Sequence, residues 1–254
     1  MKEFVLSKLP FIKRMLFLIM LVTTTILLTL ALLSYAEAFK VFSLESVKIR
    51  GNEIVLSDEI FKLTGFSFGD DMLAVDLLSA AARLESNPFI RKALISRELP
   101  NTFSIAVIER KPFAFFALDV LYCTDLNGHL LPSRSHKSFD LPVITGIEDL
   151  NLPPYGGKIN NPLFQKALNV VKILGEGSIP LYNAISEINL TPEGEVILIG
   201  ARKGTRIYLG KSGYDNKLDR IRSLMATVKP IGGLARYHYV DLRFDNQVIV
   251  KERS

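Results

Sequence analysis

The sequence predicts an α+β protein that begins with a single membrane-spanning helix and continues into two folded units. Three observations support this prediction: a long uncharged run near the N-terminus, a strand-helix-helix-strand-strand pattern after it, and a final segment rich in short strands. With 254 residues, the chain is long enough for two units that each bury a core.

The uncharged run extends from Met15 to Ala36 and reads MLFLIMLVTTTILLTLALLSYA. At about 1.5 Å per residue, a helix of this length crosses a hydrocarbon core of roughly 30 Å. A cleaved signal peptide is the alternative, because residues 34–36 and 36–38 both resemble small-x-small cleavage sites. The run exceeds the usual signal-peptide core of about 7 to 15 residues, so we expect an uncleaved anchor at residues 15–36.

Charges beside the span predict its orientation. Residues 1–14 contain four basic side chains and one acidic one, whereas Glu37 follows the span directly. Basic flanks stay in the cytoplasm, so residues 1–14 are expected to form a cytoplasmic tail and the remainder to lie outside. That tail supplies +3 of the net charge of +5, which leaves only +2 for the exported part. Such a balanced charge predicts no binding to nucleic acid.

The first unit after the span begins with a strand between Leu44 and Asn52, where apolar and charged residues alternate. Ser57 is expected to cap a short helix that ends at Gly65, because serine favours helix starts and glycine favours helix ends. An apolar stripe in residues 72–86 predicts a second helix.

Two more strands complete this unit. Ile90 to Glu98 and Phe103 to Arg110 are expected to pair antiparallel around a turn at Pro100-Asn101. Both helices would then cover one face of the sheet and leave the other face and one edge free.

The second unit, residues 112–254, is expected to contain two helices among short strands. Asn161 should cap the first helix with Pro162 at its first position, and the second helix should cover about residues 214–228. The predicted strands are 114–122, a hairpin over TDLNGHLL with Asn127-Gly128 at its tip, 143–145, 184–190, 196–199, 206–209, 237–244 and 247–251.

The sequence contains no recognisable catalytic set. Cys123 is the single cysteine, which excludes an intrachain disulfide and is expected to be a small buried hydrophobe. The three histidines lack metal-ligand spacing, and no nucleophile elbow, phosphate loop or dinucleotide fingerprint occurs. Asp70-Asp71 precedes a predicted helix and is expected to cap it rather than to act as a catalytic pair. We therefore expect no enzyme activity, no cofactor, no metal and no small-molecule substrate.

Beyond the span, several short motifs occur in a defined order. They are VKIRGN, GDDMLAVD, NPFIRKALISRELPNTFSIAVIERKPFA, DLNGHLLP and YVDLRFDNQVIVK. Their order resembles the FtsQ/DivIB family, bitopic cell-division proteins of the bacterial inner membrane. The resemblance implies a POTRA domain at residues 42–111, which is a docking module, and an FtsQ-type beta domain at residues 112–254. Pro112 would mark and stiffen the joint between them.

The resemblance also implies a function and a location. Family members are non-catalytic scaffolds of the divisome that bind the bitopic proteins FtsB and FtsL and help to coordinate septal peptidoglycan synthesis. The chain would cross the inner membrane once at the division septum, with its C-terminal domains in the periplasm. Lys92 and Arg97, on the second POTRA strand, could help other divisome proteins to recruit it; the alternative is that both are solvated strand charges.

The C-terminal strand pair is the expected partner surface. A strand that ends the chain has few residues left to cover its outer edge, although Lys251, Glu252 and Arg253 could instead protect that edge. Family members bind FtsB by strand addition around the segment matching RFDNQVIVK, and Phe244 replaces a tyrosine common in the family, which removes a hydroxyl. The resemblance therefore implies partner-binding roles for Arg243, Phe244, Asn246, Gln247, Val248, Val250 and Lys251.

Two other functions remain open. An outer-membrane assembly or secretion factor of the POTRA type would require repeated POTRA units or a barrel. A signal-anchored periplasmic hydrolase would require a catalytic set.

Overall fold

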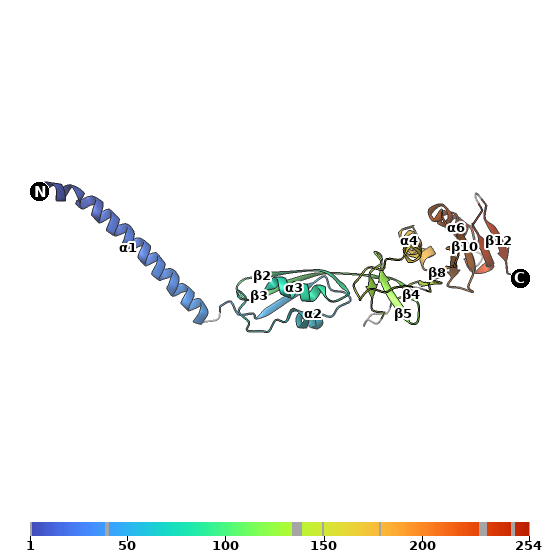
Figure 1. The fold of residues 1–254 in the computed structure, drawn as a ribbon, viewed down its shortest axis with the longest axis horizontal. Coiled ribbons are helices and arrows are strands. Elements are labelled where there is room, and N and C mark those ends of the chain that lie inside the picture. Colours follow the sequence, from blue (N-terminus) through green and yellow to red (C-terminus); the bar gives the residue numbers. More distant parts are fainter. Residues whose placement is uncertain are drawn as a thin grey trace.

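The computed structural model describes residues 2–38, 41–133, 139–148, 150–177, 179–228, 233–244 and 247–253. In chain order these residues form a long N-terminal helix, a unit with a three-stranded sheet and a unit with a nine-stranded sheet (Figure 1). We call the last two the three-stranded unit and the nine-stranded unit. The predicted α+β fold with an N-terminal helix is confirmed.

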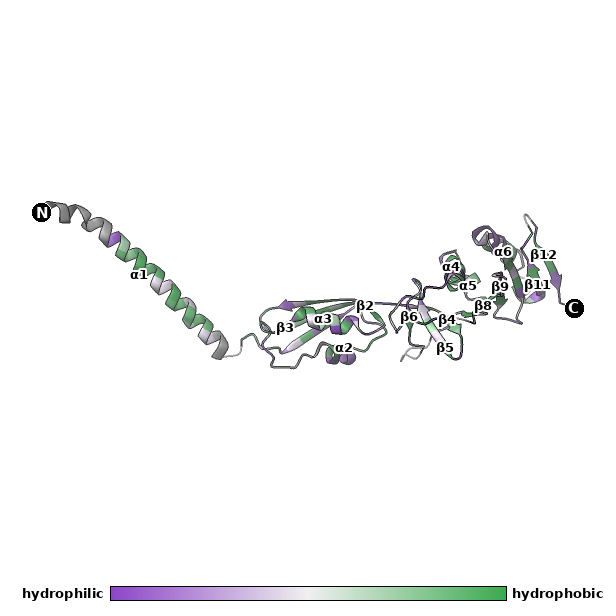
Figure 2. Ribbon diagram, viewed as in Figure 1, coloured by the Kyte–Doolittle hydropathy of each residue, from purple (hydrophilic) through white to green (hydrophobic). Residues whose placement is uncertain are grey.

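Helix α1 (Lys2–Ala38) continues without a break through the candidate membrane span Lys13–Tyr35. The described side chains of this span are exposed, and Figure 2 shows that most of them are hydrophobic. Four threonine hydroxyls in the span donate hydrogen bonds to carbonyls one turn earlier in the same helix, so each keeps an acceptor in lipid.

The three-stranded unit has the expected order of elements. Its elements are β1 (Ser46–Arg50), α2 (Ser57–Thr64), α3 (Leu77–Glu85), β2 (Ile90–Glu98) and β3 (Thr102–Glu109). The strand order is β1-β3-β2, with β3 parallel to β1 and antiparallel to β2. Phe103, Ile105 and Val107 alternate along β3 and are buried, as their spacing predicts. Gly51 lets the chain leave β1, because a Cβ there would lie 2.1 Å from the Val107 carbonyl oxygen.

Two helix starts in this unit differ from the prediction. Ser57 is the first residue of α2, and its predicted cap position is taken by Leu56, whose side chain makes no capping bond. The chain before α2 is instead held by the Glu109 carboxylate, which accepts hydrogen bonds of 2.7–2.8 Å from the backbone amides of residues 53, 54 and 55. This partner lies 54 residues away along the chain and fixes the segment ahead of α2, although it does not bond the first amides of the helix itself.

Helix α3 begins at Leu77 rather than near Met72. Asp76 is its cap and accepts hydrogen bonds from the amides of Leu78 and Ser79. Asp70 and Asp71 were expected to cap this helix, but they accept bonds from the nearby backbone amides of residues 67 and 73 and form turns. Apolar spacing over residues 72–76 therefore does not indicate helix here.

The nine-stranded unit contains two long helices among short strands. The strands are β4 (Pro112–Ala117), β5 (Leu121–Asp125), β6 (Leu130–Leu131), β7 (Val143–Thr145), β8 (Ile185–Leu190), β9 (Val196–Gly200), β10 (Arg206–Gly210), β11 (Tyr237–Asp241) and β12 (Ile249–Glu252). The helices are α4 (Pro162–Gly177), α5 (Ile179–Tyr182), α6 (Tyr214–Val228) and the 3-10 helix η2 (Gly233–Arg236). Among the described residues the strand order is β12-β11-β10-β9-β8-β7-β4-β5-β6.

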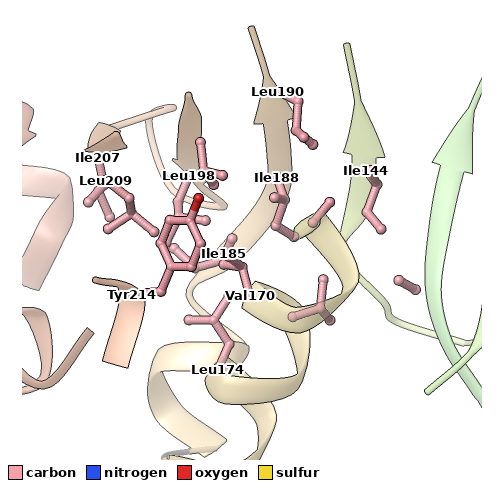
Figure 3. Close-up of a cluster of buried hydrophobic side chains, with 14 of the residues drawn as sticks. Ile144, Val170, Leu174, Ile185, Ile188, Leu190, Leu198, Ile207, Leu209 and Tyr214 are labelled. Carbon is pink, nitrogen blue, oxygen red and sulfur yellow. The ribbon is translucent and has the colours of Figure 1, made fainter. Parts of the chain in front are cut away.

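The core of this unit lies between the sheet and helices α4 and α6. Figure 3 shows Val170 and Leu174 of α4 beside Ile185 and Ile188 of β8, with Tyr214 of α6 in the same cluster. The predicted cap of α4 is confirmed, because the Asn161 side chain accepts a 3.0 Å hydrogen bond from the Phe164 amide.

Three strand boundaries differ from the prediction. The single strand expected at residues 114–122 is a hairpin of β4 and β5, which pair antiparallel around residues 118–120. Strand β11 ends at Asp241 instead of Phe244, and β12 covers residues 249–252 instead of 247–251. The predicted turn at Asp245-Asn246 lies outside the described residues.

The two units share apolar contacts where they join. Phe115, Cys123 and Leu131 of the nine-stranded unit pack with the core of the three-stranded unit. Cys123 is buried as predicted, and this burial raises the pKa of its thiol to about 12. The Arg110 guanidinium lies 3.8 Å from the buried Asp125 carboxylate across the joint. Packing and charge therefore support the connection at Pro112 in addition to the fixed φ of proline.

Candidate partner-binding edge

Strand β12 is the outermost strand at one end of the nine-stranded sheet (Figure 1). One side of β12 pairs antiparallel with β11, where Val240 faces Val250 and Asp241 faces Ile249. No described strand pairs with its other side, and all four of its residues are exposed. The main-chain groups on that side are therefore open to a partner.

The direction of these backbone groups follows from one hydrogen bond. The Arg253 amide donates to the Arg236 carbonyl at 2.9 Å, so it faces the sheet. Because successive amides in a strand point to opposite sides, those of Lys251 and Ile249 also face β11. The amides of Val250 and Glu252 then point away from the sheet and could bond an added strand.

Apolar side chains accompany this open edge. Phe244 is 52% exposed, and Val248, Ile249 and Val250 are each 38–40% exposed. Isolated exposed apolar residues are ordinary, but four within one short hairpin at an unpaired edge are typical of a contact surface. Ile249 was absent from the predicted site, although its place in the QVIVK strand would have identified it.

Arg243 is engaged within the sheet. Its guanidinium donates to the Asp241 carboxylate at 2.7 and 3.1 Å, lies 3.6 Å from Glu195, and sits 5.1 Å above the centre of the Tyr208 ring. These contacts tie the segment after β11 to the end of β11, to the residue before β9 and to β10. The sequence predicted a partner contact for Arg243; the structure places it where it holds the start of the C-terminal hairpin. The signal for this pairing is the Asp-x-Arg spacing, which puts both side chains on one face of an extended chain.

The ion pair also shifts the titration of both groups. Hydrogen bonds from the Arg243 side chain hold the pKa of the buried Asp241 carboxyl below its usual value. The same bonds raise the pKa of Arg243. Each charge therefore stabilises the other at neutral pH.

The charges at the end of β12 are also used internally. Glu252 pairs with Arg236 at 3.0 Å, and Arg253 donates to the carbonyls of Tyr237 and Lys203. Two of the three charges that could have shielded the edge thus bond to their own sheet, which favours an edge that accepts a partner over a protected one. Lys251 is exposed.

The remaining predicted residues of this segment stay predictions. Gln247 and Val248 precede β12 and are exposed, while Asn246 lies outside the described residues. Within the described ranges, no group of three or more His, Cys, Asp or Glu residues lies close enough to hold a metal ion.

The proposed recruitment residues on β2 have different surroundings. Lys92 is largely exposed and forms a 3.2 Å ion pair with Glu85. Arg97 donates hydrogen bonds of 2.6 and 2.7 Å to the carbonyls of Met72 and Val75, which fastens the turn before α3 to the end of β2. Reversing the charge of Arg97 would disturb this turn, so Lys92 gives the cleaner test of recruitment.

Comparisons with known proteins agree with this architecture. The family model described as POTRA domain, FtsQ-type, matches residues 42–110, and the model described as FtsQ/DivIB, C-terminal related, matches residues 115–251. The chain is 32% identical over 212 residues to the cell division protein FtsQ of Geobacter sp. strain M21, covering 82% of this chain and 76% of that protein. It is 30% identical over 214 residues to the FtsQ of Geotalea daltonii, covering 83% and 76%.

A more distant relative carries the other family name. The chain is 29% identical over 149 residues to the cell division protein DivIB of Bacillus subtilis, covering 58% of this chain and 51% of that protein. Together the two family models account for almost all of the chain after α1, in the order that the sequence motifs predict. The chain therefore belongs to the FtsQ/DivIB family of cell-division proteins.

Proposed function

We propose that this protein is a non-catalytic scaffold of the divisome that binds the bitopic proteins FtsB and FtsL and thereby helps to coordinate septal peptidoglycan synthesis. The observation that supports this most directly is the open outer edge of β12, with outward amides at Val250 and Glu252. An extended segment of an FtsB-type partner would continue the sheet there. Backbone bonds would supply affinity, and the apolar side chains around Phe244 would supply selectivity.

The rest of the chain serves this role in the proposal. The candidate span anchors the scaffold in the bacterial inner membrane at the division septum, with residues 1–14 in the cytoplasm and the folded units in the periplasm. The POTRA domain recruits other divisome proteins, with Lys92 as the residue to test first. The apolar contacts and the Arg110–Asp125 ion pair at the joint support the further proposal that the POTRA domain and the β12 edge keep a preferred spacing.

Val250→Pro tests the edge directly. Proline removes the outward amide and places its ring on the side from which a partner strand would approach, while the inward amides of Ile249 and Lys251 remain. We expect FtsB no longer to co-purify with the full chain from membranes. Val250→Thr is the matched control, because it keeps the amide and the β-branched shape, and it should retain FtsB.

The outcome separates the candidate functions. Thermal unfolding must first show that Val250→Pro is folded; undiminished FtsB binding by that folded variant would exclude this edge as the docking site. Recovery of outer-membrane assembly proteins instead of small bitopic proteins by the wild-type chain would favour the assembly or secretion alternative.

A further inference from the structure

One end of the three-stranded unit carries exposed apolar side chains that the proposed function does not use. We call this set the apolar rim. Its members and their exposed fractions are Val41 (38%), Phe68 (64%), Leu73 (56%), Leu78 (83%) and Leu99 (60%). They are separated in sequence, so their common location is a consequence of the fold.

Backbone hydrogen bonds bring the rim segments together. The segment that follows α1 bonds to the loop that carries Phe68 and Leu73: the Gly69 amide donates to the Leu44 carbonyl at 2.8 Å, and the Met72 amide to the Phe42 carbonyl at 2.9 Å. The same segment bonds to the turn that carries Leu99, through the Glu45 amide and the Asn101 carbonyl at 2.9 Å. These three segments therefore lie at the end of the unit where the chain enters from α1.

Leu78 belongs to the same end. Arg97, next to the end of β2, donates to the carbonyls of Met72 and Val75, and α3 starts directly afterwards at Leu77. Leu78 therefore lies in the first turn of α3, directly after the segment that Arg97 holds. Phe68 is held in place by stacking on Phe61 of α2, with ring centres 5.1 Å apart.

The length of the connection keeps this end close to the membrane. The candidate span ends at Tyr35, α1 continues to Ala38, and Val41 follows three residues later. At about 1.5 Å per helical residue and at most about 3.5 Å per extended residue, Val41 lies within about 15 Å of the end of the span. The polar headgroup layer on each side of a bilayer is roughly 5 to 8 Å thick, and interfacial apolar groups sink about 5 to 10 Å.

We propose that the apolar rim inserts into the lipid headgroup layer next to the span, so that the POTRA domain rests on the membrane instead of standing free of it. The occupant is lipid because the tether leaves the rim within reach of the interface. The rim is flanked by acids at positions 45, 70, 71 and 98 as well as by Lys48 and Arg97. This mixed charge gives no attraction to anionic lipid, so the contact is apolar and zwitterionic lipid suffices.

Fluorescence quenching in the full chain tests the contact. The protein is reconstituted into phosphatidylcholine vesicles with an environment-sensitive fluorophore on Leu73→Cys, and lipid carrying a spin label at a shallow depth serves as the quencher. Leu94→Cys is the matched control, because Leu94 is 68% exposed in the middle of β2, away from the rim. The native Cys123 is 1% exposed and stays unlabelled in the folded protein.

We expect strong quenching at position 73 and only background quenching at position 94, unchanged by high salt. Adding Phe68→Gln and Leu99→Gln to the labelled Leu73→Cys chain should abolish the quenching, whereas adding Ile108→Gln, a 50% exposed residue of β3, should not. Background quenching at both positions would overturn the proposal. Quenching that requires anionic lipid and disappears in high salt would also overturn it, because the contact would then be electrostatic. None of these readouts depends on FtsB, so they are independent of the β12 test.

Discussion

Phe244 gives a quantitative test of the proposed partner edge. Its side chain is 52% exposed, so about 100 Å² of a phenylalanine surface of about 200 Å² remains for a partner to cover. At about 25 cal/mol per Å², covering this area contributes about 2.5 kcal/mol at most, and alanine retains a small part of it. We expect Phe244→Ala to weaken FtsB binding by about 2 kcal/mol, which is roughly 30-fold in Kd. The free energy of unfolding should also fall, by about 2 kcal/mol at most, because the fold already covers the other half of the ring, so thermal unfolding must first show that the variant is folded in the assay.

The assay is a titration of the full chain, in detergent or nanodiscs, with a fluorescent FtsB segment. Leu94→Ala is the matched control, since it removes a similarly exposed apolar side chain from the POTRA domain, far along the chain from β12. The control should leave Kd unchanged. A change below about threefold for Phe244→Ala, or an equal change for both variants, would refute the reasoning, because area covered at this edge would then not determine affinity.

Three further predictions concern topology and stability. A reporter fused after residue 254 should be active only outside the cytoplasm, and the mature protein should retain residues 15–36; a mature N-terminus at Glu37 would contradict the anchor. Glu109→Ala should lower the free energy of unfolding by about 2 to 3 kcal/mol in chemical denaturation, because three backbone amides lose a charged acceptor, and a loss below about 0.5 kcal/mol would contradict this role. The pKa of Asp241 is lower in the folded state than in the unfolded state. Its ion pair with Arg243 therefore stabilises the fold fully above the unfolded pKa of about 4. This contribution is lost as the pH falls through the lower pKa of the folded state. Asp241→Asn should therefore be less stable than wild type at pH 7 and lose less stability on acidification below about pH 4; identical acid profiles would contradict it.

Local patterns were sufficient for most elements. Strand β2 was predicted at Ile90 to Glu98 and is found there, because alternation and the Pro100-Asn101 turn are both local signals. Helix α4 begins as predicted, since Asn161 and Pro162 are side-chain and backbone preferences of one helix turn. The family resemblance, confirmed by both family models, depended on the order of such local motifs.

Predictions were wrong where a distant partner decided the local structure. Glu109 fixes residues 53–55 just ahead of α2, and Ser57 becomes the first residue of the helix instead of its cap. The strand expected at residues 114–122 folds into two strands because β4 pairs with β5 on one side and with β7 on the other. Apolar composition alone does not show where such a run turns back on itself.

The sequence by itself determined the candidate span, the order of helices and strands and the apolar faces, because hydropathy, periodicity and turn residues act over a few neighbours. Only the tertiary structure decided that β12 is the outermost strand, that Arg243 reaches Glu195 and Tyr208, and that the apolar rim gathers at the end of the three-stranded unit where the chain enters. These features depend on which segments pair across the sheet and on contacts between residues far apart in the chain. Such contacts are fixed by the packing of the whole core, and they leave no signal in any short stretch of sequence.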